Sequence, residues 1–203
     1  MIDRQACVRA LVGALTDELV VTGLGYAAFD TYAAGDRPRN FYLSGALGSA
    51  AAVAFGLAAT RPDQRVVCVD GDGSVLANLG ALATIGRYAP TNLLCVVLDN
   101  MMFQITGGQA THTAFGADLA TIARGCGIAS AATAASLPDL TAHLSEMLAN
   151  PGPHVLVAKV DQRQSSSYQP RKGVLIKYRF MHALGLAPDV AALAWAPTSE
   201  KGS

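Results

Sequence analysis

The sequence predicts an α/β fold, in which a doubly wound, mostly parallel sheet carries helices on both faces. Two observations support this prediction. Several short runs, such as residues 66–69 and 93–98, are apolar at every position, which is typical of strands covered on both faces. These runs alternate with segments of helical periodicity, as they do in consecutive strand–helix–strand units.

The first part of the chain contains three predicted strands and one predicted helix. The strand over 18–22 is followed by a turn that contains Gly23 and Gly25. Residues 48–60 are mostly small and apolar, which favours a helix packed closely on a sheet. The other two predicted strands cover residues 40–43 and 65–70.

The second part of the chain continues the same alternation. Residues 78–88 place Leu79, Leu82 and Ile85 at a spacing near 3.6, so this segment is predicted to be helical. The remaining predicted elements are a strand over 93–98, helices over 118–125 and 137–149, and a strand over 154–160.

The predicted organisation is one domain with a C-terminal extension. Residues 1–160 are expected to form the α/β domain. Residues 161–172 are polar and rich in serine, which indicates a linker or loop. Residues 173–203 are expected to form a docking helix and a tail.

The composition excludes several classes of protein. The chain has 203 residues, of which 51% are hydrophobic and 15% charged, and its net charge is zero. A nucleic-acid binder needs a basic surplus, and a disordered chain would be poorer in apolar residues. The low charge has two explanations that remain open here: a surface covered by another subunit, or an alanine-rich compositional bias.

No targeting signal or membrane span is expected, so the sequence predicts a cytoplasmic protein without membrane contact. The four cysteines are widely spaced and form no CxxC motif. Buried free thiols in a reducing compartment are the favoured interpretation.

Polar side chains follow two neighbouring predicted strands. Gly71, Asp72, Gly73 and Ser74 come after one strand, and Asn100 follows the next one, 28 positions beyond Asp72. One strand–helix–strand crossover has about this length, so both side chains should reach the same edge of the sheet. Their oxygens are hard ligands suited to Mg²⁺ or Ca²⁺, and the glycines allow backbone N–H groups to approach a phosphate.

The full pattern resembles a known family. The segments that carry the likeness are GDGSVLANLGALATIGRYAPTNLLCVVLDN over 71–100, TGGQATHT over 106–113, NFYLSGALG over 40–48 and RFM over 179–181. They resemble the diphosphate-binding domain of thiamine-diphosphate-dependent enzymes, and within that family the sulfopyruvate and phosphonopyruvate decarboxylases. The likeness covers most of residues 15–185.

This resemblance implies a cofactor, thiamine diphosphate, held through Mg²⁺. The implied metal ligands are the side chains of Asp72 and Asn100 and the backbone carbonyl of Met102. Leu47 would lie under the cofactor and force its bent shape, where the family more often has methionine. The other implied cofactor-binding residues are Gly23, Gly25, Tyr26, Gly45, Gly71, Gly73, Ser74 and Thr106.

The implied catalytic residues are His112, Gln109 and Leu47. His112 and Gln109 follow the metal-binding turn and should lie close to the reactive carbon of the cofactor. His112 could orient a 2-oxo acid or transfer a proton. The alternative is a loop histidine that is hydrogen-bonded to backbone.

The chain contains only three glutamates, Glu18, Glu146 and Glu200, and none of them follows a predicted strand. The family activates the cofactor with a glutamate on a pyrimidine-binding domain, for which this chain has no room. The resemblance therefore implies a pyrimidine-binding partner subunit that supplies the activating glutamate, in a hetero-oligomer of α2β2 or larger composition.

The leading hypothesis is one subunit of a thiamine-diphosphate-dependent decarboxylase that acts on a small 2-oxo acid. Related alternatives are a carboligase or oxidoreductase subunit and a non-catalytic cofactor-binding module. A generic nucleotide-binding domain fits less well, because the glycine pattern after the first strand is incomplete.

Overall fold

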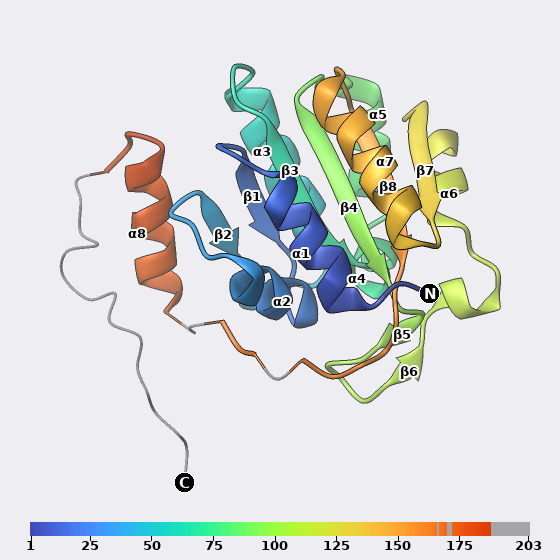
Figure 1. The fold of residues 1–203 in the computed structure, drawn as a ribbon. Helices are drawn as coiled ribbons and strands as arrows, with labels where there is room; N and C mark the ends of the chain where they lie inside the picture. Colours follow the sequence, from blue (N-terminus) through green and yellow to red (C-terminus); the bar gives the residue numbers. More distant parts are fainter. Residues whose placement is uncertain (166, 170–171, 188–203) are drawn as a thin grey trace, which may run out of the picture.

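The computed structural model describes residues 1–165, 167–169 and 172–187. Its centre is a six-stranded sheet with the strand order β2-β1-β3-β4-β8-β7, in which every pair is parallel (Figure 1). The predicted α/β class is confirmed. The strands are β1 (Leu19–Thr22), β2 (Asn40–Tyr42), β3 (Val66–Gly71), β4 (Leu93–Asp99), β7 (Ser130–Ala134) and β8 (His154–Lys159).

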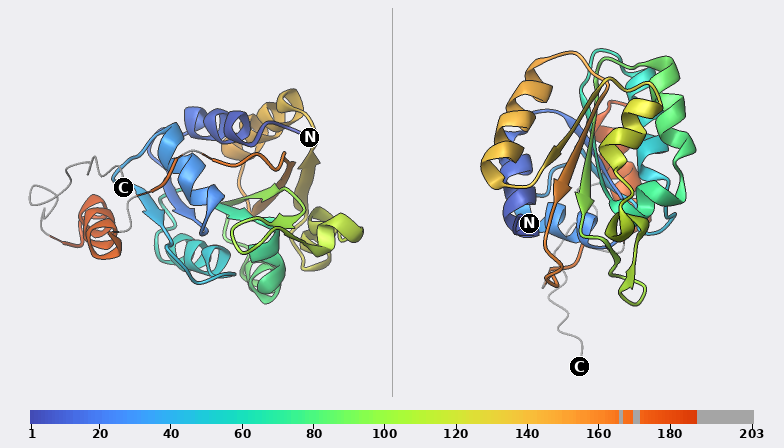
Figure 2. Two further views of the ribbon diagram at one scale, coloured as in Figure 1. Left: turned by 90° about the horizontal axis from the view of Figure 1, so that it is seen from below. Right: turned by 90° about the vertical axis from the view of Figure 1, so that its right-hand side faces the viewer.

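Helices cover both faces of the sheet, as the two views of Figure 2 show. One face is covered by α1 (Arg4–Ala14), α2 (Tyr26–Ala34) and α7 (Leu137–Ala149). The other face is covered by α3 (Ala50–Thr60), α5 (Gly80–Tyr88) and α6 (Leu119–Gly125).

The core consists of two apolar layers, one on each face of the sheet. Val66 and Cys68 of β3 join the layer under α3 and α5, whereas Val67 and Val69 join the layer under α1 and α7. Successive side chains of a strand point to opposite faces. Continuous apolar runs therefore fill both layers, which is why the strands could be predicted.

Two helices that cover the sheet and one of its strands were not predicted from the sequence. These are the helices α1 and α2 and the strand β7. A short helix, α4 (Asp72–Ala77), also begins directly after β3, ahead of the helix that was predicted from residue 78. The loop after β4 folds into the hairpin of β5 (Met102–Phe103) and β6 (Gln109–Ala110), followed by the 3-10 helix η1 (His112–Phe115).

The chain leaves β8 through an extended segment, which we call the C-terminal strap and define as residues 161–165 and 167–169. It crosses the lower side of the molecule (Figures 1 and 2) and stacks Tyr168 on Phe29 with 5.0 Å between ring centroids. The helix α8 (Gly173–Ala183) follows at the β2 edge of the sheet. The predicted division into domain, linker and tail stays a prediction, and the tail at 188–203 lies outside the described residues.

The helix α8 packs on the edge strand β2. Phe180 contacts Phe41 with 5.3 Å between ring centroids. Arg179 donates two hydrogen bonds to the Asp36 carboxylate, at 2.5 and 2.9 Å, and a third to the backbone carbonyl of Asn40 at 3.3 Å. These contacts fix α8 along the outer side of β2.

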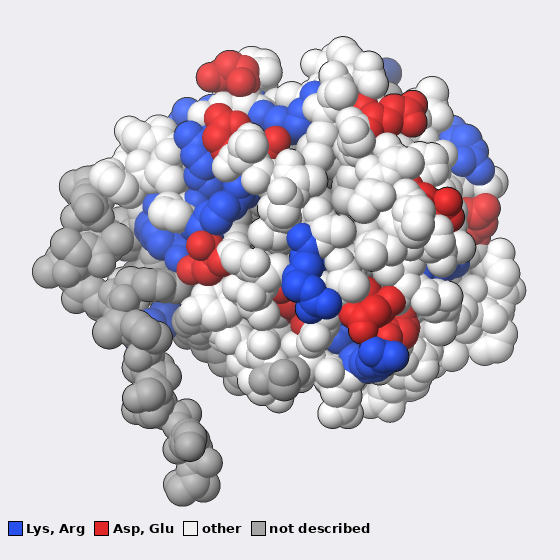
Figure 3. All heavy atoms as spheres, viewed as in Figure 1, with Lys and Arg blue, Asp and Glu red and all other residues white. Residues whose placement is uncertain are grey.

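Charged side chains gather in a few clusters, with wide uncharged areas between them (Figure 3). Within the described part of the chain, no helix is long and apolar enough to cross a membrane.

Candidate active site

The candidate site lies where β1, β3 and β4 end. In the register of β3 and β4, Asp70 is opposite Val97 and Gly71 is opposite Leu98, so both strands end at the same edge. The chain order reverses between β1 and β3, since β2 lies on one side of β1 and β3 on the other. Ligands of open parallel sheets bind outside the strand ends at such a reversal.

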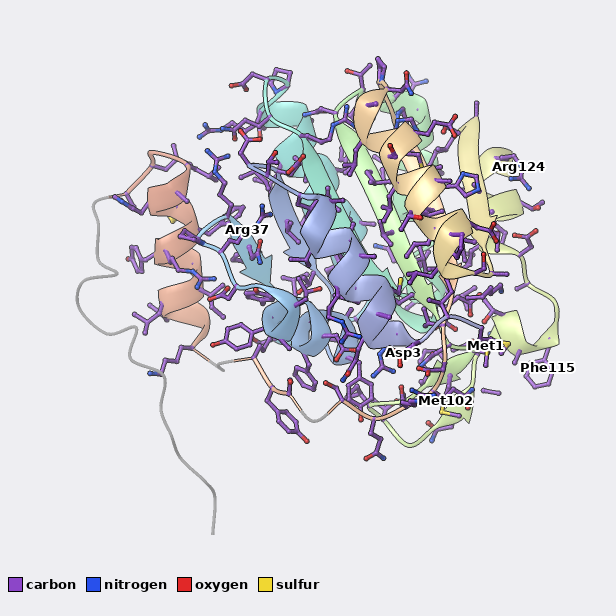
Figure 4. The ribbon with its side chains drawn as sticks, viewed as in Figure 1. Met1, Asp3, Arg37, Met102, Phe115 and Arg124 are labelled. Carbon is purple, nitrogen blue, oxygen red and sulfur yellow. The ribbon has the colours of Figure 1, made fainter. Side chains whose placement is uncertain are left out.

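A pocket of about 620 Å³, part of it open solvent, occupies this position. Figure 4 shows Met102 at this lower edge of the sheet and Phe115 on the neighbouring loop, pointing away from the molecule. The pocket residues come from the first turn of α1, from the segments after β1, β2 and β3, and from the loop after β4. Those used below are Arg4, Tyr26, Leu47, Asp70, Gly71, Asp72, Gly73, Ser74, Asn100, Met102, Phe103, Gln104, Ile105 and Thr106.

Asp72 and Asp70 are the two buried carboxylates that line the pocket, and 1% of the surface of Asp72 is exposed. Thr111 donates a hydrogen bond to its Oδ2 atom at 2.5 Å, and the Thr113 hydroxyl lies 3.0 Å from the same atom. Burial, followed by the nearby negative charge of Asp99, raises the pKa of Asp72, and the Thr111 hydrogen bond opposes this shift. A bound cation would favour the ionised carboxylate.

A second buried acid lies behind Asp72. Asp99 is fully buried and forms an ion pair with Lys159 of β8. Its Oδ1 atom accepts a hydrogen bond from Thr113 at 2.8 Å. The Thr113 hydroxyl lies within hydrogen-bond distance of both acids, so it connects Asp72 to Asp99, which is paired with Lys159.

Asp70 and Ser74 organise the turn that carries Asp72. Ser74 donates a hydrogen bond to Asp70 at 2.8 Å and accepts one from the Gly48 N–H at 2.9 Å. Burial raises the pKa of Asp70 to about 6, and the Ser74 hydrogen bond lowers it. A Cβ atom at Gly23 would lie 1.8 Å from Asp70 Oδ1, so Gly23 is required by packing against this carboxylate.

Asn100 follows β4 in a tight turn. The next residue, Met101, has φ of +61°. The Asn100 side chain accepts the Met102 N–H at 3.0 Å through Oδ1 and donates from Nδ2 to Gln104 at 2.9 Å. An amide oxygen has two lone pairs, so Oδ1 retains one of them for a further ligand.

The backbone at the start of α4 suits a phosphate. The first turn of a helix leaves N–H groups without intrahelical acceptors, and no side chain caps this helix. A Cβ atom at Gly71 would meet nothing within 4 Å, whereas one at Gly73 would lie 2.4 Å from the Phe103 ring. Gly71 thus has open space beside it at the start of α4, and Gly73 allows the Phe103 ring to approach the backbone closely.

These residues fit a divalent cation that is held together with a diphosphate. The described residues contain no cluster of three or more His, Cys, Asp or Glu side chains. Mg²⁺ typically uses only one or two protein carboxylates, and phosphate oxygens and water complete its coordination. The donors available here are the Asp72 carboxylate, the Asn100 amide oxygen and the Met102 carbonyl. All three residues line one pocket.

The pocket brings together nine of the fourteen site residues named from the sequence. These nine are Tyr26, Leu47, Gly71, Asp72, Gly73, Ser74, Asn100, Met102 and Thr106. Gly23, Gly25, Gly45 and Gln109 do not line it; neither does His112, which is exposed at the start of η1. A Cβ atom at Gly25, where φ is +72°, would lie 2.5 Å from Ile105, so this glycine shapes the pocket wall.

Among the pocket residues that sequence reasoning missed are two polar ones, Arg4 and Gln104. Arg4 is 2% exposed, forms an ion pair with Asp30 at 2.7 Å and lies over the Tyr26 ring at 4.5 Å from its centroid. A signal was available, because Asp3 caps a helix in which Cys7 and its neighbours have helical spacing. An arginine in the first turn of that helix gave no indication of where it would point.

Comparison with known proteins assigns the chain to a family. Residues 23–158 match the family described as the thiamine pyrophosphate enzymes, C-terminal TPP binding domain. The chain belongs to this family. Asp72, Asn100 and the glycines beside them therefore lie inside the TPP-binding domain of a thiamine pyrophosphate enzyme.

Individual relatives agree with this assignment. The chain is 38% identical to the sulfopyruvate decarboxylase subunit beta of Methanocaldococcus jannaschii, covering 82% of this chain and 88% of that protein. It is 45% identical to the phosphonopyruvate decarboxylase of Streptomyces viridochromogenes, covering 68% of this chain but only 34% of that protein. A thiamin diphosphate-dependent enzyme of Mycobacterium smegmatis has a similar structure, with a TM-score of 0.64 and 27% identity over 79% of this chain and 32% of that chain.

The two glutamates within the described residues lie outside the pocket lining. Glu18 precedes β1 at the amino end of the sheet, and Glu146 lies in α7. Neither lines the pocket, and Glu200 is outside the described residues.

Proposed function

We propose that this chain is the diphosphate- and Mg²⁺-binding subunit of a thiamine-diphosphate-dependent 2-oxo acid decarboxylase of the sulfopyruvate or phosphonopyruvate type. One observation carries the proposal: Asp72, Asn100 and Met102 line a single pocket beside the glycine-flanked start of α4. The relative from Methanocaldococcus jannaschii, a named beta subunit, supports it because this chain spans 88% of that protein.

In this proposal, each group has a defined task. Asp72, Asn100 and the Met102 carbonyl hold Mg²⁺, and the backbone N–H groups of Gly73 and Ser74 bind the diphosphate. Leu47, which is 50% exposed and lines the pocket, supports the cofactor from below. Bound thiamine diphosphate supplies a carbon nucleophile and an electron sink, through which a 2-oxo acid loses CO₂ and is released as an aldehyde.

The exposed loop residues His112 and Gln109 are assigned to the substrate. Both lie on the loop after Asn100, outside the pocket wall. A second subunit seated over this edge would enclose them with the 2-oxo acid. We assign to that partner the pyrimidine-binding role and the activating glutamate, because neither Glu18 nor Glu146 approaches the pocket.

The test uses the complex of this chain with its partner subunit, supplied with thiamine diphosphate, Mg²⁺ and sulfopyruvate or phosphonopyruvate. We expect CO₂ and the corresponding aldehyde in equal amounts. Asp72→Ala should abolish turnover and weaken cofactor binding in calorimetry by at least about 100-fold, since it removes a charged ligand. Asp63→Ala changes an exposed aspartate near the amino end of β3 and serves as the matched control.

Two results would contradict the proposal. One is a wild-type complex that binds neither thiamine diphosphate nor Mg²⁺. The other is an Asp72→Ala complex that binds both as tightly as the Asp63→Ala complex does. Formation of a ligated product in place of the aldehyde would assign the chain to a carboligase.

A further inference from the structure

Gln104 receives two hydrogen bonds at one atom. The Oε1 atom of Gln104 accepts from Asn100 Nδ2 and from Arg4 Nη1, each at 2.9 Å. Both donors carry only N–H groups at these positions, so the Gln104 carbonyl oxygen must face them. The orientation of the Gln104 amide is therefore fixed by chemistry as well as by packing.

The other end of the same amide is also occupied. Gln104 Nε2 donates to the backbone carbonyl of Gln162, at 2.5 Å, and the Gln162 side chain donates to the backbone carbonyl of Asn100 at 2.8 Å. Gln162 belongs to the C-terminal strap. Asn100 is thus held at its side chain by Gln104 and at its backbone by the strap.

Arg4 is itself firmly held. Its guanidinium pairs with the buried Asp30 and lies over Tyr26, and its side chain is 3% exposed. Because the planar guanidinium is fixed on two sides, an N–H group of its Nη1 atom is directed at Gln104. The start of α1 and the strap, which are distant in sequence, therefore converge on the loop that follows β4.

This network decides which end of the Asn100 amide faces the pocket. With Nδ2 committed to Gln104, the Oδ1 atom is directed away from Gln104, and within the described residues it accepts a hydrogen bond from the Met102 N–H only. A rotated amide would present two N–H groups to a cation and could not bind it.

We infer that Gln104, anchored by Arg4 and Gln162, is a positioning residue that holds the Asn100 amide with its oxygen toward the metal. The inference rests on the proposed function, because it assigns Asn100 as a metal ligand. Groups that orient a metal ligand typically contribute 10- to 100-fold to metal affinity. Gln104 should therefore act on metal binding although it is not a ligand itself.

The experiment compares variants of the two-subunit complex in the presence of thiamine diphosphate, with Mn²⁺ as the probe and its binding followed by electron paramagnetic resonance. Gln104→Leu removes the acceptor and should raise the Kd of Mn²⁺ about 10-fold or more. Gln104→Glu keeps an acceptor for Arg4 and Asn100 but loses the donor to the Gln162 carbonyl, so it should retain more of the Mn²⁺ affinity than Gln104→Leu does. Gln164→Leu makes the same chemical change at an exposed strap residue and should leave the Kd unchanged.

Thermal unfolding with and without ligands separates positioning from a merely structural role. Gln104→Leu leaves the Arg4 and Asn100 donors without this acceptor, so some stability is lost even without ligands. The deciding readout is the further rise in unfolding temperature on adding Mn²⁺ and cofactor, which should be much smaller in Gln104→Leu than in wild type. Equal Mn²⁺ affinity in Gln104→Leu and wild type would overturn the inference and leave the proposed function intact. A wild-type complex that binds no Mn²⁺ would overturn both.

Discussion

At the residue scale, the chemistry of the site depends on two threonines as much as on its acids. Asp72 contacts Thr111 and Thr113, and Thr113 also contacts Asp99. An unpartnered buried carboxylate would be costly, because burial penalises its charged form. The threonine hydroxyls supply hydrogen-bond partners for the buried Asp72 carboxylate.

We predict that Thr113→Val weakens the binding of Mg²⁺ and thiamine diphosphate by about tenfold or more, because it removes the hydroxyl between two acids while keeping the side-chain shape. Thr113→Ser retains the hydroxyl and should bind within a few-fold of wild type. Isothermal titration calorimetry on the complex checks this. If the valine variant binds as tightly as the serine variant, Thr113 has no such role.

The sequence predicted the residues of the site better than their partners. Asp72 and Asn100 could be placed together because each follows a strand, and adjacent parallel strands end at one edge. Arg4 and Gln104 could not, because their contacts depend on how α1 and the loop after β4 pack against each other. Such contacts join residues about 100 positions apart, and no local pattern encodes them.

At the scale of the element, helix caps make a separable contribution to stability. Asp118 begins α6, and its Oδ1 atom accepts hydrogen bonds from the N–H groups of Ala120 and Thr121. Its Oδ2 atom accepts from the Thr121 hydroxyl, and this hydrogen bond is the main reason why the pKa of Asp118 is lowered.

We predict that Asp118→Ala lowers the free energy of unfolding by about 1 kcal/mol at pH 7. The folded pKa lies below the unfolded value of about 3.9, so the stabilisation is complete above the unfolded value. It begins to fall below that value and is lost as the pH falls through the lower, folded pKa. The loss in Asp118→Ala should therefore shrink near pH 3.5. Urea unfolding at both pH values measures it, and Asp118→Asn, which keeps the cap, is the control.

The elements missed in the sequence have physical reasons for being difficult. The strand β7 consists of Ser, Ala and Thr and is only partly buried, so it lacks the apolar run of its neighbours. The helix α2 follows two glycines that favour a turn. Strands such as β4, buried at every position, were found because burial on both faces leaves a continuous apolar run.

At the scale of the whole molecule, the low charge of the chain and the exposed apolar side chains near the pocket have the same explanation. The site is open at the strand ends, and Leu47, Ile105 and Phe115 near it are 50%, 46% and 82% exposed. A chain with 15% charged residues and exposed apolar side chains around its pocket is suited to the covering subunit that we propose. This favours the first of the two explanations for its low charge.

We predict that the chain alone does not decarboxylate 2-oxo acids, and that activity appears when the partner subunit is added. Changing the partner's strand-end glutamate to glutamine should abolish turnover, because the cofactor is no longer activated. Glu18→Gln and Glu146→Gln in this chain are the matched controls and should leave turnover unchanged. Aldehyde formation measures each combination, and activity of the isolated chain would contradict the prediction.

Each of the two edge strands of the central sheet accepts a hydrogen bond from an arginine side chain. Arg179 of α8 donates to the Asn40 carbonyl of β2, and Arg124 of α6 donates to the Ala131 carbonyl of β7 at 2.7 Å. Exposed edge strands are templates for the addition of further strands, and hence for aggregation. An arginine that occupies an edge carbonyl blocks this route while leaving the strand ends free. The molecule is thereby protected from the addition of further strands at β2 and β7. The carboxyl ends of its strands, where the pocket lies, are left as the surface suited to association.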